Sequence, residues 1–368
     1  MLINHSELFD CGRDIYSNIA GFLAQKYKAP LPIRYFFELT HRCNLKCPYC
    51  YLCDKKVEQE LSFDDWLNII KQIPRYSFVT LVGGEPLLRE DFCEILRAVS
   101  KRTFNKTHIV TNGILLNDKI ISSLIQNKLM LLSVSLDGWK DNHDKNRGAQ
   151  GIFQKITTNL DELAQKCKYS DTDIMIDIKS IVLKDNLSDL VKLYEYATNK
   201  GYEFFSISFL RNNNLKQYPE LKTTFGKEFY AQKYPIVPYF DMVEFERAYH
   251  EIQKIKKYSK TKIRFAPKFD NHDSKVELET IKRFFTQDKD KNVRDIYKPC
   301  LYPYSNTIIN PMGDVYPCLS YKMGNVKEQK LSDIINDKKY RLFRRKLDNL
   351  KVFECCQMCC ELKVKENQ

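Results

Sequence analysis

The 368-residue sequence has no long hydrophobic run, no secretory signal and no internal repeat of the solenoid type. A membrane-spanning helix needs about 18 consecutive apolar residues, and no stretch approaches this length. The first residues, MLINHSELFDCGRD, lack the positive start and the apolar segment of a signal peptide. These absences predict a soluble, cytoplasmic protein. Its 13 cysteines would stay reduced there, as metal ligands, catalytic thiols or packed side chains.

Acidic residues are fewer than basic ones. The sequence has 47 Asp and Glu residues against 59 Lys and Arg residues, which gives a formal net charge of +12. Part of the surplus is in the run KKYRLFRRK at residues 338–346. Such a run is typical of a solvated helix face, and we do not expect nucleic acid as a partner from charge alone. An anionic substrate or an acidic carrier protein fits the same charge.

The first cysteine group lacks a fourth member. The segment HRCNLKCPYC, residues 41–50, holds Cys43, Cys47 and Cys50. A structural zinc site takes four protein ligands and disulfides take an even number of cysteines, so this trio fills neither. A cubane iron–sulfur cluster takes one thiolate for each iron, and three cysteines leave one iron open to an exogenous ligand.

Short apolar strands with polar or glycine-rich ends alternate with segments of helical period. The predicted strands span residues 33–40, 78–86, 108–113, 131–138, 174–182 and 204–210. Strands joined by helical crossovers form a parallel sheet that is buried on both faces, with its chemistry at the carboxyl ends. The sequence therefore predicts an α/β fold, a partial (β/α)6 TIM-like barrel followed by a small cysteine-rich domain.

Four segments are expected along the chain. Residues 1–30 hold an amphipathic helix, residues 31–215 form the barrel, residues 216–299 connect, and residues 300–368 form the cysteine-rich domain. We expect the connector to help cover the barrel mouth. In the last segment, SNTIINPMGDVYPCL predicts a β-hairpin. The apolar stripe expected to pack the N-terminal helix consists of Ile15, Ile19, Phe22, Leu23 and Tyr27.

A second set of cysteines lies in the C-terminal segment. Cys300 and Cys318 flank the predicted hairpin, and Cys356 and Cys359 supply a CxxC pair. Four thiolates are enough to close a second 4Fe-4S cluster, and a structural zinc ribbon is the alternative. The register stays open, because Cys355 with Cys359, or Cys356 with Cys360, would offer a different spacing.

The cysteine loop and the strand ends together resemble the radical S-adenosylmethionine (SAM) superfamily, over about residues 33–210. The stretch CNLKCPYC is similar to the CxxxCxΦC motif of that family, with an aromatic residue before the last cysteine. GGEP, TNG, SVSLDG and HDKNRG follow in the family's order at or after successive strand ends. The resemblance implies that SAM binds the open iron and is cleaved to a 5'-deoxyadenosyl radical.

The resemblance also implies roles for individual residues. Glu85 would hold the SAM amino group, Arg147 would pair with the SAM carboxylate through its guanidinium fork, and Asp137 is a catalytic candidate. Cys53 is a candidate hydrogen-atom donor, with a packed thiol as the more ordinary alternative. The expected SAM-binding residues are Tyr49, Gly83, Gly84, Glu85, Pro86, Thr111, Asn112, Ser133, Ser135 and Arg147.

The C-terminal segment resembles the SPASM or twitch-type domains that carry auxiliary iron–sulfur clusters. It has too few cysteines for two such clusters, so we expect one auxiliary 4Fe-4S cluster.

The expected reaction is an oxidative modification of a small metabolite, such as a sugar, a nucleoside or a carrier-bound compound. Only about 30 residues precede the barrel, which favours this over the alternative of a peptide-modifying maturase or epimerase. A zinc-containing nucleic-acid-binding protein is the alternative from another class. Flavodoxin or ferredoxin is the expected electron donor.

Overall fold

The computed structural model describes residues 5–50, 52, 59–210, 240–269, 273–286, 292–318, 321–353, 356 and 359–365, and the side chains from residue 12 on. Two of the cysteines discussed above, Cys53 and Cys355, lie outside the described residues. Residues 211–239, which include the expected end of the barrel segment and the start of the connector, also lie outside them.

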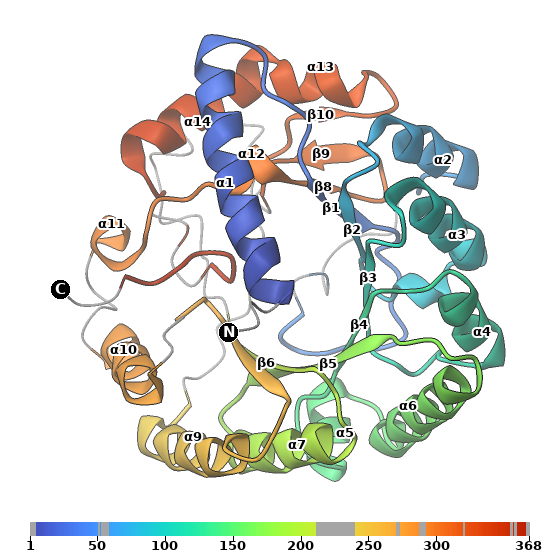
Figure 1. Cartoon of the computed structure of the whole chain (residues 1–368), viewed down its shortest axis with the longest axis vertical. Coiled ribbons are helices and arrows are strands. Elements are labelled where there is room, and N and C mark those ends of the chain that lie inside the picture. Colours follow the sequence, from blue (N-terminus) through green and yellow to red (C-terminus); the bar gives the residue numbers. More distant parts are fainter. Residues whose placement is uncertain are drawn as a thin grey trace.

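A single curved sheet forms the centre of the molecule, with strands in the order β10-β9-β8-β1-β2-β3-β4-β5-β6-β7. The run from β8 through β1 to β7 is parallel, and most of the helices stand outside the curve (Figure 1). The predicted α/β partial barrel is confirmed, since the sheet is open between β7 and β10. The parallel strands are β1 (Arg34–Glu38), β2 (Phe78–Val82), β3 (Thr107–Thr111), β4 (Leu131–Ser135), β5 (Met175–Val182), β6 (Phe204–Phe209), β7 (Lys262–Ala266) and β8 (Asn306–Ile309).

Helices alternate with these strands, and many begin where a side chain can accept hydrogen bonds from the first turn. Ser62 and Asp65 form a capping box, and Asn117, Asp241 and Asp337 cap three other helices. The helices through the barrel are α2 (Phe63–Gln72), the short η1 (Pro86–Leu88), α3 (Phe92–Thr103), α4 (Asp118–Gln126), α5 (Asp141–Arg147), α6 (Ile152–Tyr169), α7 (Leu187–Asn199), α9 (Met242–Lys256) and α10 (Ser274–Thr286).

Each strand presents one face to the helices and the other to the interior of the curve. On β1, the Phe37 ring lies 5.1 Å from Trp66 of α2, so Phe37 belongs to the outer face. Because side chains alternate along a strand, Arg34, Phe36 and Glu38 lie on the opposite, inner face. The outer face carries the main apolar core, whereas the inner face is more polar.

Helix α1 (His5–Lys26) packs on a different face from the one predicted. Ile15, Ile19 and Phe22 are 57%, 55% and 56% exposed. The packed face instead carries small residues: Ala20 is buried, and Gly21 faces the Tyr304 ring. Small side chains let the helix backbone approach helix α12 (Tyr302–Ser305) closely, so this surface decides the packing although its residues are less apolar.

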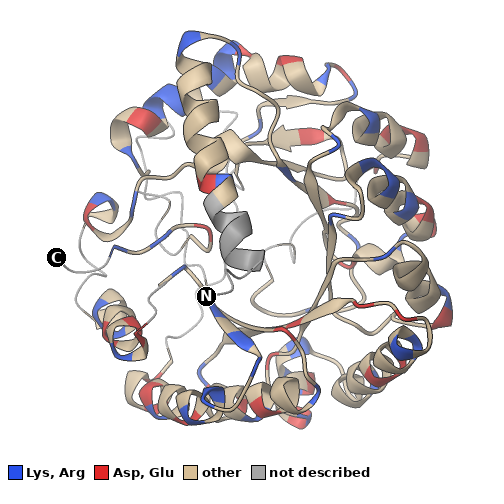
Figure 2. Ribbon diagram, in the orientation of Figure 1, with Lys and Arg blue, Asp and Glu red and all other residues tan. Residues whose placement is uncertain are grey.

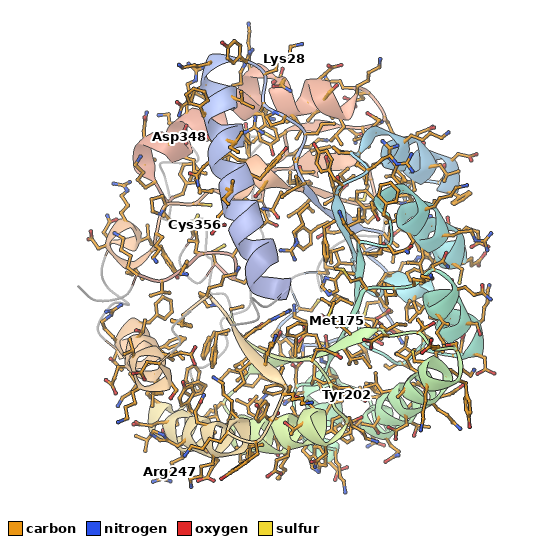
Figure 3. All side chains as sticks on the ribbon, viewed as in Figure 1. Lys28, Met175, Tyr202, Arg247, Asp348 and Cys356 are labelled. Atoms are coloured by element: carbon orange, nitrogen blue, oxygen red, sulfur yellow. The ribbon has the colours of Figure 1, made fainter. Side chains whose placement is uncertain are left out.

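The predicted hairpin is formed by β8 and β9 (Asp314–Tyr316), which pair antiparallel, and β10 (Gly324–Asn325) extends it. The basic run falls on helix α14 (Lys338–Leu350), and Figure 2 shows Lys and Arg gathered there. One side of α14 is buried, and its Asp348, labelled in Figure 3, accepts a 2.7 Å hydrogen bond from the Tyr304 hydroxyl. The remaining helices are α11 (Val293–Ile296) and α13 (Leu331–Asn336). Across the described ranges, no helix is long and apolar enough to cross a membrane.

Candidate active site

The three N-terminal cysteines lie on the loop that follows β1. Cys47 is buried, whereas Cys43 is exposed as a residue. The Cys50 amide donates a 3.1 Å hydrogen bond to the Cys47 carbonyl, and the Leu52 amide lies 3.4 Å from the Cys50 sulfur. Burial raises the pKa of both Cys43 and Cys47, and the nearby Arg147 opposes that rise at Cys47. The loop thus carries three cysteine thiols, one of which, Cys47, lies beside the Arg147 guanidinium.

A partly buried set of contacts around Glu60 and Arg89 holds the start of this cysteine loop. The Glu60 carboxylate accepts hydrogen bonds of 2.6 Å from the Thr40 hydroxyl and 2.9 Å from the His41 amide. Arg89 lies 3.8 Å from Glu60 and donates to the carbonyl oxygens of Leu39 and Leu61. These contacts span both ends of the loop. Glu60 and Arg89 belong to no motif, so the sequence alone does not mark them as part of the site.

Gly83 and Gly84 make room for the cysteine loop itself. A Cβ atom on Gly84 would lie 2.2 Å from the Arg42 carbonyl oxygen, and one on Gly83, whose φ is +143°, would lie 2.4 Å from the Thr40 carbonyl oxygen. The Gly84 amide also donates a 2.7 Å hydrogen bond to the Thr40 carbonyl. Their glycine character is therefore explained by backbone packing. A contact of either residue with SAM stays a prediction.

Glu85 joins the ends of β2 and β3. Its carboxylate accepts hydrogen bonds from the Thr111 hydroxyl at 2.7 Å, the Asn112 amide at 2.8 Å and the Leu87 amide at 3.1 Å, at the start of the short helix that opens with Pro86. Burial raises the pKa of Glu85 to about 7 against these donors. One oxygen, Oε2, has a single partner here and keeps capacity for another donor.

Asn112 ties β3 to the cysteine loop. Its side-chain amide donates a 2.7 Å hydrogen bond to the Asn44 side chain, between Cys43 and Cys47. Its side-chain oxygen accepts from the Ile114 amide. The TNG tip, the GGEP tip and the loop therefore form one hydrogen-bonded unit.

Asp137, at the end of β4, is fully buried and gathers three partners. It pairs with Arg147, accepts a 2.6 Å hydrogen bond from the Tyr49 hydroxyl and accepts a 2.7 Å hydrogen bond from the Ile181 amide. The Asp137 amide in turn donates to Nδ1 of His143 at 3.0 Å. The Asp137 carboxylate thus holds both Arg147 and Tyr49, which lies 88 residues earlier in the sequence.

Arg147 reaches from this network to the cysteines. Its Nη1 atom lies 3.7 Å from the Cys47 sulfur, and Nε is buried with no hydrogen-bond partner. An orphaned buried donor on a side chain that contacts the Cys47 thiol is what a site for an iron–sulfur cluster with an anionic ligand group would provide. The donor set therefore fits a cluster and a SAM carboxylate. The assignment of each residue to them stays a prediction.

The two serines of SVSLDG have different surroundings. The Ser133 hydroxyl already has two partners, Asp177 at 2.7 Å and His108 Nε2 at 2.9 Å. For Ser135, the described part of the chain offers no hydrogen-bond partner to its side chain, which is partly exposed. Ser135 is thus the more available of the two for a ribose.

The C-terminal cysteines converge on Cys300. Burial raises the pKa of the Cys300 thiol well above its ordinary value, and Cys356, Cys359 and Cys318 nearby raise it further. Cys356 follows α14 (Figure 3), and Cys360 lies near Tyr302. Within the ranges described, no three His, Cys, Asp or Glu side chains form a ready site for a single ion. Cluster thiolates bind different irons and so stand further apart than ligands of one ion.

Sequence reasoning also missed a chain of polar side chains on the inner face of the sheet. His108 contacts Thr80 at 3.3 Å and Ser133, and Asp177 accepts from both Ser133 and Ser206, the latter at 2.7 Å. The sequence contains a pattern that indicates this polar inner face, because strands such as LLSVS, MIDIKSIV and FFSISF have polar residues two positions apart.

Comparison with known families identifies two regions. Residues 37–197 match the radical SAM superfamily, and residues 300–360 match the SPASM iron–sulfur cluster-binding domain. The chain thus contains a radical SAM domain and a C-terminal SPASM domain, and these domains imply a SAM-binding 4Fe-4S cluster together with auxiliary iron–sulfur chemistry. This supports iron–sulfur over zinc at both cysteine sets.

Among curated relatives, the sporulation killing factor maturation protein SkfB of Bacillus subtilis is 26% identical over 48% of this chain and 42% of SkfB. The subtilosin biosynthesis protein AlbA of the same species is 29% identical over 49% of this chain and 40% of AlbA. The chain spans less than half the length of these two proteins. The AdoMet-dependent heme synthase of Methanosarcina barkeri is 26% identical over 88% of this chain and 87% of that protein.

Among solved structures, SuiB of Streptococcus suis bound to S-adenosylmethionine covers 98% of this chain, which covers 79% of SuiB. The TM-score is 0.64 at 17% sequence identity, so the likeness establishes the fold.

Proposed function

We propose that this protein uses SAM-derived radical chemistry to modify a peptide. The observation that carries the radical chemistry is the three-cysteine loop with Arg147 Nε left without a partner beside it. The peptide substrate is supported by the names of relatives. SkfB is a maturation protein, PqqA peptide cyclase from Granulibacter bethesdensis is 27% identical over 46% of this chain, and SuiB is solved with its precursor peptide SuiA.

This proposal replaces a small metabolite as the leading substrate class. The expectation of a small metabolite rested on the short segment before the barrel, which is weaker support than the peptide-related names. The heme synthase match keeps a small molecule as the second candidate, because that alignment spans 87% of the relative.

When bound, the cluster and SAM supply the 5'-deoxyadenosyl radical that removes hydrogen from a substrate carbon. The chain contributes position and charge. Asp137 fixes the Arg147 guanidinium and the Tyr49 hydroxyl, and we assign Arg147 Nε to the SAM carboxylate. Glu85 Oε2 is assigned to the SAM amino group, which would share that carboxylate with the Asn112 amide. Ser135 is assigned to the ribose.

We further propose that Cys300, Cys318, Cys356 and Cys359 hold one auxiliary 4Fe-4S cluster. Cys318, Cys356 and Cys359 all lie close enough to Cys300 to raise its pKa, which supports this set over one that includes Cys360. A fully ligated cluster favours accepting an electron over binding the substrate, so the proposed outcome is net oxidation of the peptide. The proposed functional boundaries are residues 31–215 for the barrel and 300–368 for the auxiliary domain, with flavodoxin or ferredoxin as electron donor.

The test uses the full chain, reconstituted anaerobically. We expect about eight irons with matching sulfide for two cubane clusters, and 5'-deoxyadenosine when dithionite and SAM are added. Cys43→Ala should lose about four irons and all 5'-deoxyadenosine. For the substrate, deuterated versions of small peptides encoded beside the gene are compared with sugars and nucleosides. Deuterium in 5'-deoxyadenosine from a peptide supports the proposal, and deuterium only from a small metabolite overturns the peptide assignment.

A further inference from the structure

The helix-to-strand turns of the barrel form one face of the molecule, at the amino ends of the parallel strands. These turns follow α2, α3, α4, α6, α7 and α9. Because each helix runs back along the sheet before the next parallel strand, the turns lie at the end opposite the carboxyl ends of the strands. The cysteine loop follows β1 and therefore lies at the other end. We call the surface made by the turns the amino-end face.

Helix α1 lies along the same face. It ends at Lys26, shortly before β1 begins, and the Tyr16 hydroxyl donates a 2.5 Å hydrogen bond to the Leu31 carbonyl in the segment that leads into β1. Gly21 faces the ring of Tyr304, just before β8 begins. Helix α1 thus crosses the amino ends of β1 and β8. Its exposed stripe, which consists of Ile15, Ile19 and Phe22, lies on the side of the helix opposite the buried Ala20.

All the aromatic side chains that are largely exposed among the described residues lie on this face. Tyr258 is 92% exposed, Tyr169 80% and Phe104 60%, and each lies at or next to the last residue of a helix that leads into a strand. The others are Phe22, Tyr27 and Tyr76. Single exposed apolar residues are ordinary on a protein surface, but a gathering on one face indicates a contact surface.

Basic side chains stand beside these rings. Lys257 and Lys260 flank Tyr258 in the sequence, and the Arg75 guanidinium lies 4.7 Å from the centre of the Phe104 ring. The other basic residues between a helix and the next strand are Lys28, Lys106, Lys128 and Lys200. Each exposed aromatic group on the turns therefore has a cation near it in the sequence or in space.

The acids of the amino-end face leave most of this charge in place. They lie in the turns before β5 and β6, and they are Asp171, Asp173 and Glu203. Four of the cations in the other turns make no ion pair with any described residue, namely Lys106, Lys128, Lys257 and Lys260. The face is thus basic around β3, β4 and β7, and apolar along α1.

An anionic lipid surface matches this combination. Aromatic side chains favour the membrane–water interface, a helix with an exposed apolar stripe can lie in its plane, and Lys side chains attract anionic headgroups. A second copy of the chain would bring two basic faces together, which is repulsive. Nucleic acid would engage the cations through its phosphates but would offer little to Ile15 and Ile19.

We propose that the amino-end face binds peripherally to an anionic lipid surface. Ile15, Ile19 and Phe22 enter the boundary between headgroups and acyl chains, and the lysines of the turns contact the headgroups. The candidate active site lies at the other end of the strands, so it faces away from the lipid. The inference goes beyond the proposed function, since none of these residues belongs to the candidate active site.

The test is co-sedimentation of the anaerobically reconstituted full chain with lipid vesicles. One set of vesicles is phosphatidylcholine alone, and the other is phosphatidylcholine and phosphatidylglycerol in equal parts. We expect the anionic vesicles to reach half-maximal binding at about tenfold less lipid. Most of this preference should disappear at about 1 M salt, where the screening length falls to about 3 Å. No binding, or equal binding to both sets, overturns the proposal.

Variants then locate the contact. Ile19→Ser should raise the lipid concentration for half-maximal binding about tenfold, because it removes an aliphatic group that enters the lipid. Lys257→Gln should raise it about fivefold on the anionic vesicles alone. Tyr258→Ala, at a side chain that is 92% exposed, gives a further test that does not depend on α1.

The matched controls remove exposed side chains from the opposite end of the barrel. Val243→Ser changes the start of α9 and Lys119→Gln the start of α4, and both should bind lipid as the wild type does. All variants should keep the iron content and circular dichroism of the wild type, since the replaced side chains are exposed. Wild-type binding by both Ile19→Ser and Tyr258→Ala, or an equal loss in Val243→Ser, overturns the assignment.

Two other partners give results that differ from those of a lipid surface. A second copy would double the mass in sedimentation equilibrium without lipid, and Ile19→Ser would restore the monomer. Polyuridylate would bind as tightly as the anionic vesicles, with no change in Ile19→Ser. Either result overturns the lipid assignment. Formation of 5'-deoxyadenosine without vesicles tests the proposed function separately, and it should be equal in the wild type and Ile19→Ser.

Discussion

Replacing Asp137 with Asn tests whether the ion pair with Arg147 is what holds the centre of the site together. The Asp137 side chain is fully buried and that of Arg147 is 12% exposed. Asparagine keeps the size and can still accept from the Ile181 amide, but it leaves the guanidinium without a negative partner. Because the pKa of Arg147 is raised above its ordinary value by Asp137 in spite of burial, the guanidinium stays charged.

The cost of this change follows from the burial of the pair. Breaking a buried ion pair by removing one partner costs about 3–5 kcal/mol, whereas replacing both partners by apolar groups is often close to neutral. Unfolding entropy of about 2.1 cal/mol/K per residue then places the melting temperature of Asp137→Asn about 5 °C below that of the wild type. The double variant Asp137→Asn/Arg147→Met should recover much of that loss.

The assay is anaerobic thermal unfolding of the four proteins of this double-mutant cycle, at matched iron content. The coupling energy between the two positions is the deciding quantity. Tyr49→Phe serves as a control, because it removes one hydrogen bond to the Asp137 carboxylate and should cost about 1.5–3 kcal/mol without breaking the ion pair. An Asp137→Asn protein that melts with the wild type, or a double variant that melts no higher than Asp137→Asn, would refute the reasoning.

Three further changes test other parts of the structure. Gly84→Ala places a methyl group 2.2 Å from the Arg42 carbonyl oxygen, so iron bound at the first cluster should fall by more than half while circular dichroism stays near that of the wild type. His108 is held neutral, so the folded protein loses stability as the pH falls below about 6.5, and His108→Gln should flatten the melting temperature between pH 7.5 and 5.5. Cys356→Ser should lower iron from about eight to about four atoms per chain, while Cys360→Ser keeps all of it; the reverse result would assign Cys360 to the cluster.

The strand order of the barrel was predictable because each parallel strand is a short apolar run with a marked end. The predicted strand at 131–138 contains β4, Leu131–Ser135, and its three extra residues form the Asp137 turn. β7 was less visible, since Lys262 and Arg264 interrupt the apolar run KIRFA and nothing local marks it as a barrel strand. Its position depends on pairing with β6, a tertiary contact that no short window contains.

The site was predictable as a set of motifs, but its internal contacts were not. Tyr49 and Asp137 are 88 residues apart, and only the folded sheet shows that one hydrogen-bonds the other. The GGEP glycines illustrate the same limit. Their spacing marks a place of close approach, but the sequence does not tell that the approaching group is the backbone at Thr40 and Arg42.

Helix α1 shows where hydrophobicity misleads. A stripe of large apolar residues normally marks the packed face of a helix. Here the packed face carries small residues, and a Cβ atom on Gly21 would already lie 3.8 Å from the Tyr304 ring, in van der Waals contact. Steric fit therefore outweighs apolar area at this contact.

The pairing of β8 with β1 has a consequence for the placement of the two cysteine sets. The strand that precedes the cysteine loop and the strand that opens the C-terminal hairpin are neighbours in a single ladder, with Arg34 to Phe37 aligned on Asn306 to Ile309. Main-chain hydrogen bonds, rather than the long covalent path that joins the domains, thus set where the hairpin lies relative to the cysteine loop. Lengthening that path would leave this placement unchanged, whereas a one-residue slip in the ladder would alter it.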